Sequence, residues 1–131
     1  GIIFSIGDLQ RLLKSTVIAE IFLQEDSKWD ENIYLIINNI LIDKKDKIAF
    51  LINKELDNFI IKKLERKFDE FIKNKQIIII NDVDEKNECK NLLSIIQLGV
   101  TKKSSIKELK YRTMFKNDYF LGFIILNNFS I

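Results

Sequence analysis

The strongest pattern in the sequence is an amphipathic segment that leads into a short apolar run. In residues 55–73 apolar side chains recur every three or four positions, which is the period of a helix with one buried face. The run QIIII at 76–80 is typical of a central strand covered on both faces. A long helix followed by a buried strand predicts a mixed α/β domain.

Apolar and β-branched runs predict three further strands, at 16–23, 48–52 and 119–126. Residues 105–115 are predicted to form another strand. This strand pairs with 119–126 as a hairpin across a Lys-Asn-Asp turn. A chain that ends in a hairpin is expected to form an antiparallel sheet instead of a purely parallel one.

Two shorter segments have helical spacing. Residues 5–15 are predicted to be a helix capped by Ser5, and residues 85–98 a weaker helix that ends at Gly99. The polar stretch 24–31 is interpreted as a turn. The apolar segment 33–42 fits either a strand or a buried helix, because periodicity does not separate the two in so short a run.

Length and charge restrict the class of protein. The chain has 131 residues and no Pro/Gly/Ser-rich break, so we expect a single domain spanning 1–131, excised from a longer protein. Its opening residues, 1–14, are apolar enough to form part of a connector helix. A net charge of +2 argues against a nucleic-acid partner. The apolar runs are too short to span a membrane. A single cysteine and no signal peptide indicate a cytoplasmic location.

Missing residue types argue against catalysis. The chain has no histidine, which excludes Ser–His and Cys–His nucleophile pairs and histidine metal sites. Its four glycines do not form a phosphate-binding loop. We therefore expect a binding domain, not an enzyme, and the sequence identifies no cofactor or metal.

The second half of the chain resembles the GAF family of sensory domains. The resemblance rests on the helix and strand that end in Asp82-Val83, on Ser105-Ile106 at the start of the next strand, and on LGFIILN at 121–127. Two positions depart from the family pattern. Glu108-Leu109-Lys110 stands where the family often has proline, and Asn74-Lys75 replaces the usual glycine.

The resemblance implies a fold and a function. The fold would be an antiparallel sheet of about six strands, with helices packed on one face and a small-molecule pocket on the other. The function would be ligand sensing by a homodimer that controls an output domain, such as a signalling enzyme or a transcription factor. The alternative is a dimerisation or protein-interaction module of the same fold, whose pocket is filled by large side chains such as the ten phenylalanines.

Four residues are candidate ligand contacts. Asp82 opens an acidic cluster that suits either a polar anchor or an ordinary helix start. Cys89 is the only thiol, and a structural role is the alternative to a ligand contact. In the family, a cysteine that binds a bilin is typically followed by a histidine, but this chain has none. Tyr111 and Arg112 fall on the predicted strand beside the hairpin, where they suit an anionic ligand or an exposed edge.

Overall fold

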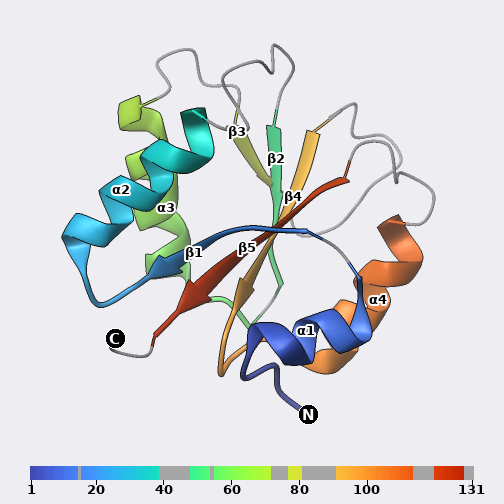
Figure 1. The fold of residues 1–131 in the computed structure, drawn as a ribbon. Helices are drawn as coiled ribbons and strands as arrows, with labels where there is room; N and C mark the ends of the chain where they lie inside the picture. The colour runs from blue at the N-terminus through green and yellow to red at the C-terminus, as the bar shows by residue number, and fades with distance from the viewer. Residues whose placement is uncertain are drawn as a thin grey trace.

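The computed structural model describes residues 1–14, 16–38, 48–53, 55–71, 77–80, 91–113 and 120–128. Helices and strands alternate through most of this part of the chain (Figure 1). The helices are α1 (Ile6–Leu12), α2 (Asp26–Ile36), α3 (Asn58–Phe71) and α4 (Lys103–Thr113). The strands are β1 (Val17–Phe22), β2 (Ile48–Leu51), β3 (Ile77–Ile80), β4 (Asn91–Gln97) and β5 (Phe120–Asn127).

The strands form one sheet of five in the order β1-β5-β4-β2-β3, and every pairing is parallel. The predicted antiparallel, six-stranded, GAF-like sheet is therefore wrong. Strand β5 was correctly predicted as a strand but wrongly as half of a hairpin, because it lies between β1 and β4. The apolar run of β3 was expected at the centre of the sheet and instead forms an edge strand.

Two elements were assigned the wrong type. Residues 91–97 form β4 instead of a helix, and all seven of its residues are buried, as in a strand covered on both faces. Residues 103–113 form α4 instead of a strand. There, Ile106 and Leu109 are buried three positions apart while Lys107 is exposed, which is helical spacing.

Helix α2 explains two other differences. The predicted turn at 24–31 is wrong, because the helix begins at Asp26. Residues 33–42, which fit either a strand or a helix by sequence, are helical as far as Ile36. Residues 39–42 lie outside the described part of the chain. The predictions for α1, β1, β2 and α3 are confirmed, with the Ser5 side chain capping α1 by accepting from the amide of Asp8.

Helices cover both faces of the sheet (Figure 1). The prediction that they pack on one face only is therefore wrong. On one face α2 and α3 pack over a core that contains Trp29, Phe50 and Phe68, with the two phenylalanine rings edge to face. On the other face α1 and α4 pack over a core that contains Leu9 and Phe123. None of the described helices is both long and apolar enough to cross a membrane.

The strand order contains a reversal in the middle of the sheet. If the count starts at β2 and ends with β1, the order reads 2-1-3-4-5, which is one of the two common orders of doubly wound α/β sheets. From β2 the chain crosses through α3 to β3 on one side, and from β4 it crosses through α4 to β5 on the other. The neighbours β2 and β4 therefore form the switch point, where the connections diverge to opposite faces.

The chain before α1 is part of the domain. Ile2 forms an antiparallel bridge with Lys102, and Ile3 is fully buried. The amide of Ile3 donates to the carbonyl of Thr101, and the carbonyl of Ile3 accepts from Gly99. Residues 1–3 are therefore held against the loop that joins β4 to α4. The connector role predicted for residues 1–14 stays a prediction.

Candidate functional site

The structure places two of the four sequence-based candidates. Asp82 and Cys89 lie outside the described residues. Tyr111 and Arg112 belong to the last turn of α4, so their predicted place on a strand beside a hairpin is wrong, while their role as ligand contacts stays a prediction. The structure instead directs attention to the switch point between β2 and β4. In open α/β sheets, ligands bind outside the carboxyl ends of the strands at such a point.

Two short loops leave the carboxyl ends of β2 and β4 there. The first loop, after β2, contains Asn53 and Glu55, and the second, after β4, contains residues 98–102. In the described structure, four buried side-chain atoms have no hydrogen-bond partner. Three of them lie at these carboxyl ends, namely Asn53 Nδ2, Glu55 Oε2 and Gln97 Oε1.

Gln97 is the last residue of β4 and is only 3% exposed. Its backbone amide donates to Thr101 Oγ1 at 2.9 Å, which shapes the second loop. Its side-chain oxygen has no donor in the described part of the chain. A buried acceptor without a partner costs about 1–3 kcal/mol, so such a group calls for an explanation.

Glu55 connects the first loop to α4. Ser105 Oγ donates to Glu55 Oε1 at 2.6 Å, and this bond joins the loop after β2 to the first turn of the helix after β4. The other oxygen, Oε2, is buried and unpaired, and Glu55 forms no ion pair with a described residue. Glu55 is therefore a partly buried carboxylate that the described residues satisfy at only one of its two oxygens.

Protein oxygens bind an amide at each of the two helix N-termini at this edge. At α3 the Asp57 carboxylate accepts from the amide of Phe59 at 2.9 Å. At α4 the amide of Lys103 donates to the carbonyl of Gly1 at 2.9 Å. Helix N-termini commonly bind phosphate through free amides. Here a protein oxygen already binds one of these amides at the start of each helix. The described residues also contain no cluster of three or more His, Cys, Asp or Glu side chains that would hold a metal.

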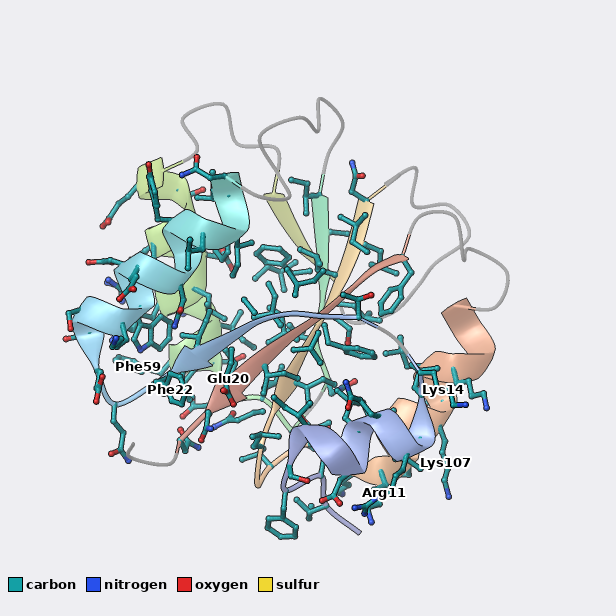
Figure 2. All side chains as sticks on the ribbon, in the orientation of Figure 1. Arg11, Lys14, Glu20, Phe22, Phe59 and Lys107 are labelled. Carbon is teal, nitrogen blue, oxygen red and sulfur yellow. The ribbon has the colours of Figure 1, made fainter. Side chains whose placement is uncertain are left out.

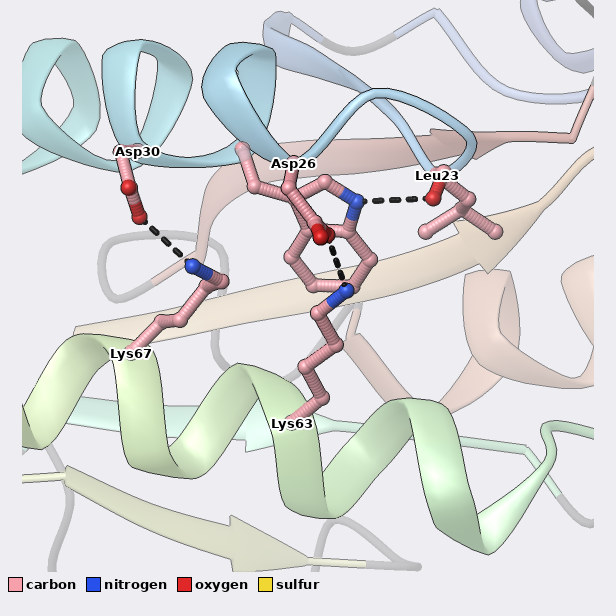
Figure 3. Close-up of polar contacts among 6 residues, drawn as sticks. Leu23, Asp26, Asp30, Lys63 and Lys67 are labelled. Atoms are coloured by element: carbon pink, nitrogen blue, oxygen red, sulfur yellow. Dashed lines mark hydrogen bonds and ion pairs between the residues drawn. The ribbon is translucent and has the colours of Figure 1, made fainter.

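A second set of polar side chains joins α2 to α3 and has a structural role (Figure 3). Lys63 and Lys67 of α3 form ion pairs with Asp26 and Asp30 of α2, at 2.6 and 2.7 Å. The Lys63 ammonium also lies 4.5 Å from the centre of the Trp29 ring. The hydrogen bond from Lys63, reinforced by its charge, lowers the pKa of Asp26 from its ordinary value of 3.8.

Trp29 anchors the same region to the sheet. Its Nε1 donates to the carbonyl of Leu23 at 3.0 Å, just after β1, while its ring is buried (Figure 3). Each of these contacts is satisfied within the domain, so the α2–α3 pair needs no ligand to explain it.

The switch-point residues were missed by sequence reasoning, although a signal was present. Asn53 directly follows the apolar run IAFLI, and Gln97 directly follows LLSII. Polar side chains at the ends of buried strands are typical of sites in parallel sheets, but residues 85–98 had been interpreted as a helix. No family model, curated protein or solved structure matches this chain.

Proposed function

We propose that this domain binds a small polar ligand at the carboxyl edge of the sheet, between the loops that follow β2 and β4. The role is regulatory: ligand binding reports to an output domain in the longer protein. The ligand-sensing role predicted from the sequence is thus kept, while the GAF-like sheet is not.

One observation carries this proposal. The side-chain oxygen of Gln97 is buried at the switch point and has no hydrogen-bond donor in the described structure. Glu55 Oε2, in the loop after the neighbouring strand β2, also lacks a donor there. A folded chain gains nothing from keeping such groups unpaired, because each loses its bonds to water. A ligand that donates hydrogen bonds to them would account for both.

The described groups favour binding over catalysis. They are amides, hydroxyls and one carboxylate, and Thr101 and Ser105 already take part in hydrogen bonds within the protein. No histidine is present in the chain to act as a base near neutral pH. We therefore propose a sensor that releases its ligand unchanged.

Native mass spectrometry of protein purified from cells tests this function. The wild type is expected to carry a small molecule that is lost on denaturation, and Gln97→Met is expected to lose that molecule while it stays folded. The matched control is Gln10→Met, which makes the same change at an exposed position on α1. A retained molecule that survives Gln97→Met unchanged would place its site elsewhere and refute the proposal.

A protein-interaction role is the second candidate, and the outer surface of α2 favours it. Tyr34 and Leu35 are adjacent there and are 56% and 47% exposed. Large exposed apolar side chains are typical of contact surfaces. If α2 mediates a homodimer, analytical ultracentrifugation should show a dimer that Leu35→Glu converts to a monomer. A wild type that is monomeric at all concentrations would refute this candidate.

A further inference from the structure

The positive charge of the protein is concentrated in the layer that α1 and α4 form on one face of the sheet. We define the basic layer as residues 1–14 and 102–110. It contains two acids, Asp8 and Glu108, and six basic residues, which are Arg11, Lys14, Lys102, Lys103, Lys107 and Lys110. The rest of the chain carries 15 basic and 17 acidic side chains, because the whole has 21 and 19. The net charge of +2 therefore combines a basic layer of +4 with a remainder of −2.

The two helices of the basic layer are neighbours. Leu9 of α1 and Ile106 of α4 belong to the same buried cluster. Arg11, Lys14 and Lys107 lie on the same side of the molecule, and Phe59 of α3 lies on the opposite side (Figure 2). The basic side chains of the two helices therefore form one surface.

The lysines of α4 form a stripe along one flank of that helix. Lys103, Lys107 and Lys110 are four and three residues apart, which places them on the same side of an α-helix. The opposite flank carries Ser105, which bonds to Glu55 in the loop after β2. The chain entering α1 lies beside the lysine stripe, since a Cβ atom on Gly1 would lie 3.4 Å from the side chain of Lys103. The stripe therefore faces the side of the layer on which α1 begins.

The charges of this surface are largely uncompensated within the domain. Lys14, Lys102 and Lys107 are exposed and form no ion pair with a described residue. Arg11 pairs with Asp8 at 3.1 Å, yet its side chain is still 80% exposed. Positive charges that share a surface repel each other and create a potential that attracts an anionic partner.

The residue types favour a lipid surface over a nucleic acid. The basic layer has five lysines and one arginine, and the arginine is already bound by Asp8. Arginine is the preferred residue for bidentate contacts to nucleic acids, whereas lysine is a hydrated point charge. Clustered lysines are attracted by the diffuse negative potential of anionic lipids. Phe4, directly before α1, is 59% exposed, and an exposed aromatic ring beside basic residues is typical of proteins that lie on a membrane.

We propose that α1 and α4 form a peripheral docking surface for membranes that contain anionic lipids. The lysines lie against the lipid headgroups, and the Phe4 ring enters the boundary between the headgroups and the acyl chains. This contact lies on the surface of the membrane and does not cross it. The proposal does not depend on the ligand site at the carboxyl edge, so each can fail without the other.

Co-sedimentation with lipid vesicles tests the proposal. One set of vesicles is phosphatidylcholine alone, and in the other about a third of the lipid is phosphatidylserine. The wild type is expected to sediment with the anionic vesicles and to stay in solution with the neutral ones. Binding should weaken as salt is added, because the Debye length falls from about 10 Å at 0.1 M to about 3 Å at 1 M ionic strength.

Two pairs of variants locate the contact. Lys107→Gln should lower the partition coefficient about fivefold, whereas Lys62→Gln, which removes the same charge from an exposed position of α3, should bind as the wild type does. Phe4→Ser should lower it roughly fivefold or more. Its control is Phe59→Ser, at a position of α3 that is 68% exposed, and it should leave binding unchanged. Circular dichroism shows whether each variant is folded.

Several results would overturn the proposal. These are equal sedimentation with neutral vesicles, no sedimentation with anionic ones, an equal effect of Lys107→Gln and Lys62→Gln, and unchanged binding of Phe4→Ser. Fluorescence anisotropy with a labelled DNA duplex of random sequence and a labelled single-stranded RNA adds one more outcome. If either binds in a buffer in which the anionic vesicles do not, the basic layer serves a nucleic acid instead of a membrane.

Discussion

Gly122 is the position where the sheet leaves no room for a side chain. It lies in β5 with φ +142°, a conformation that residues with a side chain rarely adopt. A Cβ atom there would lie 2.4 Å from the backbone oxygen of Thr16 and 3.0 Å from the side chain of Ile18. The same oxygen of Thr16 accepts the amide of Phe123 at 2.9 Å. The contact exists only because β1 runs beside β5.

Replacement of Gly122 by Ala should therefore be costly. Backbone strain in such a region costs about 1–3 kcal/mol. The clash with a backbone atom is comparable to overpacking at about 1–3 kcal/mol, and loss of the Phe123–Thr16 bond adds about 1 kcal/mol. Strain and clash relax through the same movement, so we expect about 3–5 kcal/mol in total. That is a large part of the roughly 5–15 kcal/mol that holds a domain together.

Thermal and urea unfolding followed by circular dichroism measure this loss. At the usual unfolding entropy per residue, a chain of 131 residues loses roughly 3–4 °C per kcal/mol, so Tm should fall by about 10–18 °C. Gly7→Ala is the control, because its Cβ would meet no atom closer than 3.6 Å in helix α1, and it should gain up to about 1 kcal/mol. Equal stability of Gly122→Ala and wild type would refute the pairing of β1 with β5.

Three further predictions concern the core and the α2–α3 pair. Trp29→Phe removes the bond to the Leu23 carbonyl and should cost about 1–3 kcal/mol in urea unfolding with an unchanged m-value; a variant as stable as the wild type would show that the bond contributes nothing. Ile124→Ala empties a fully buried position on the interior strand β5 and should cost about 2–5 kcal/mol by the same assay, whereas a cost below about 1 kcal/mol would contradict its burial. Asp26→Asn removes the charge that pairs with Lys63, and the lowered pKa of Asp26 means that its stabilisation is complete above pH 3.8 and is lost as pH falls through the folded-state value. The wild type should therefore exceed this variant in stability at pH 7, and the difference should shrink steadily as the pH falls below 3.8; a difference that does not shrink would exclude the ion pair as its cause.

Local patterns predicted some elements well and others wrongly, for physical reasons. The long helix α3 was evident because its apolar face repeats over several turns, and β1 and β2 were evident from β-branched runs. In β4 the side chains of Leu92, Leu93 and Ile96 fit a helical spacing equally well. The deciding fact, burial of the whole strand, depends on neighbours distant in sequence.

The topology was less accessible than the elements. A strand that ends a hairpin and a strand at the centre of a parallel sheet are both short apolar runs, and the chain has no proline to mark turns. The candidate site depended on topology in turn. The local signal at Gln97, a polar residue directly after an apolar run, becomes informative only when β4 is placed beside β2, which makes Gln97 the end of a switch-point strand.

The free energy of unfolding of Gln97→Met tests the central claim most directly, because it needs no knowledge of the ligand. If the Gln97 oxygen is unpaired in the free protein, a thioether of similar shape removes a buried acceptor and adds apolar contacts. The account predicts that urea unfolding of ligand-free protein gives a variant as stable as the wild type or up to about 2 kcal/mol more stable. A loss of more than about 1 kcal/mol would show that the side-chain amide of Gln97 has a structural role within the free protein, and would contradict a site at the switch point.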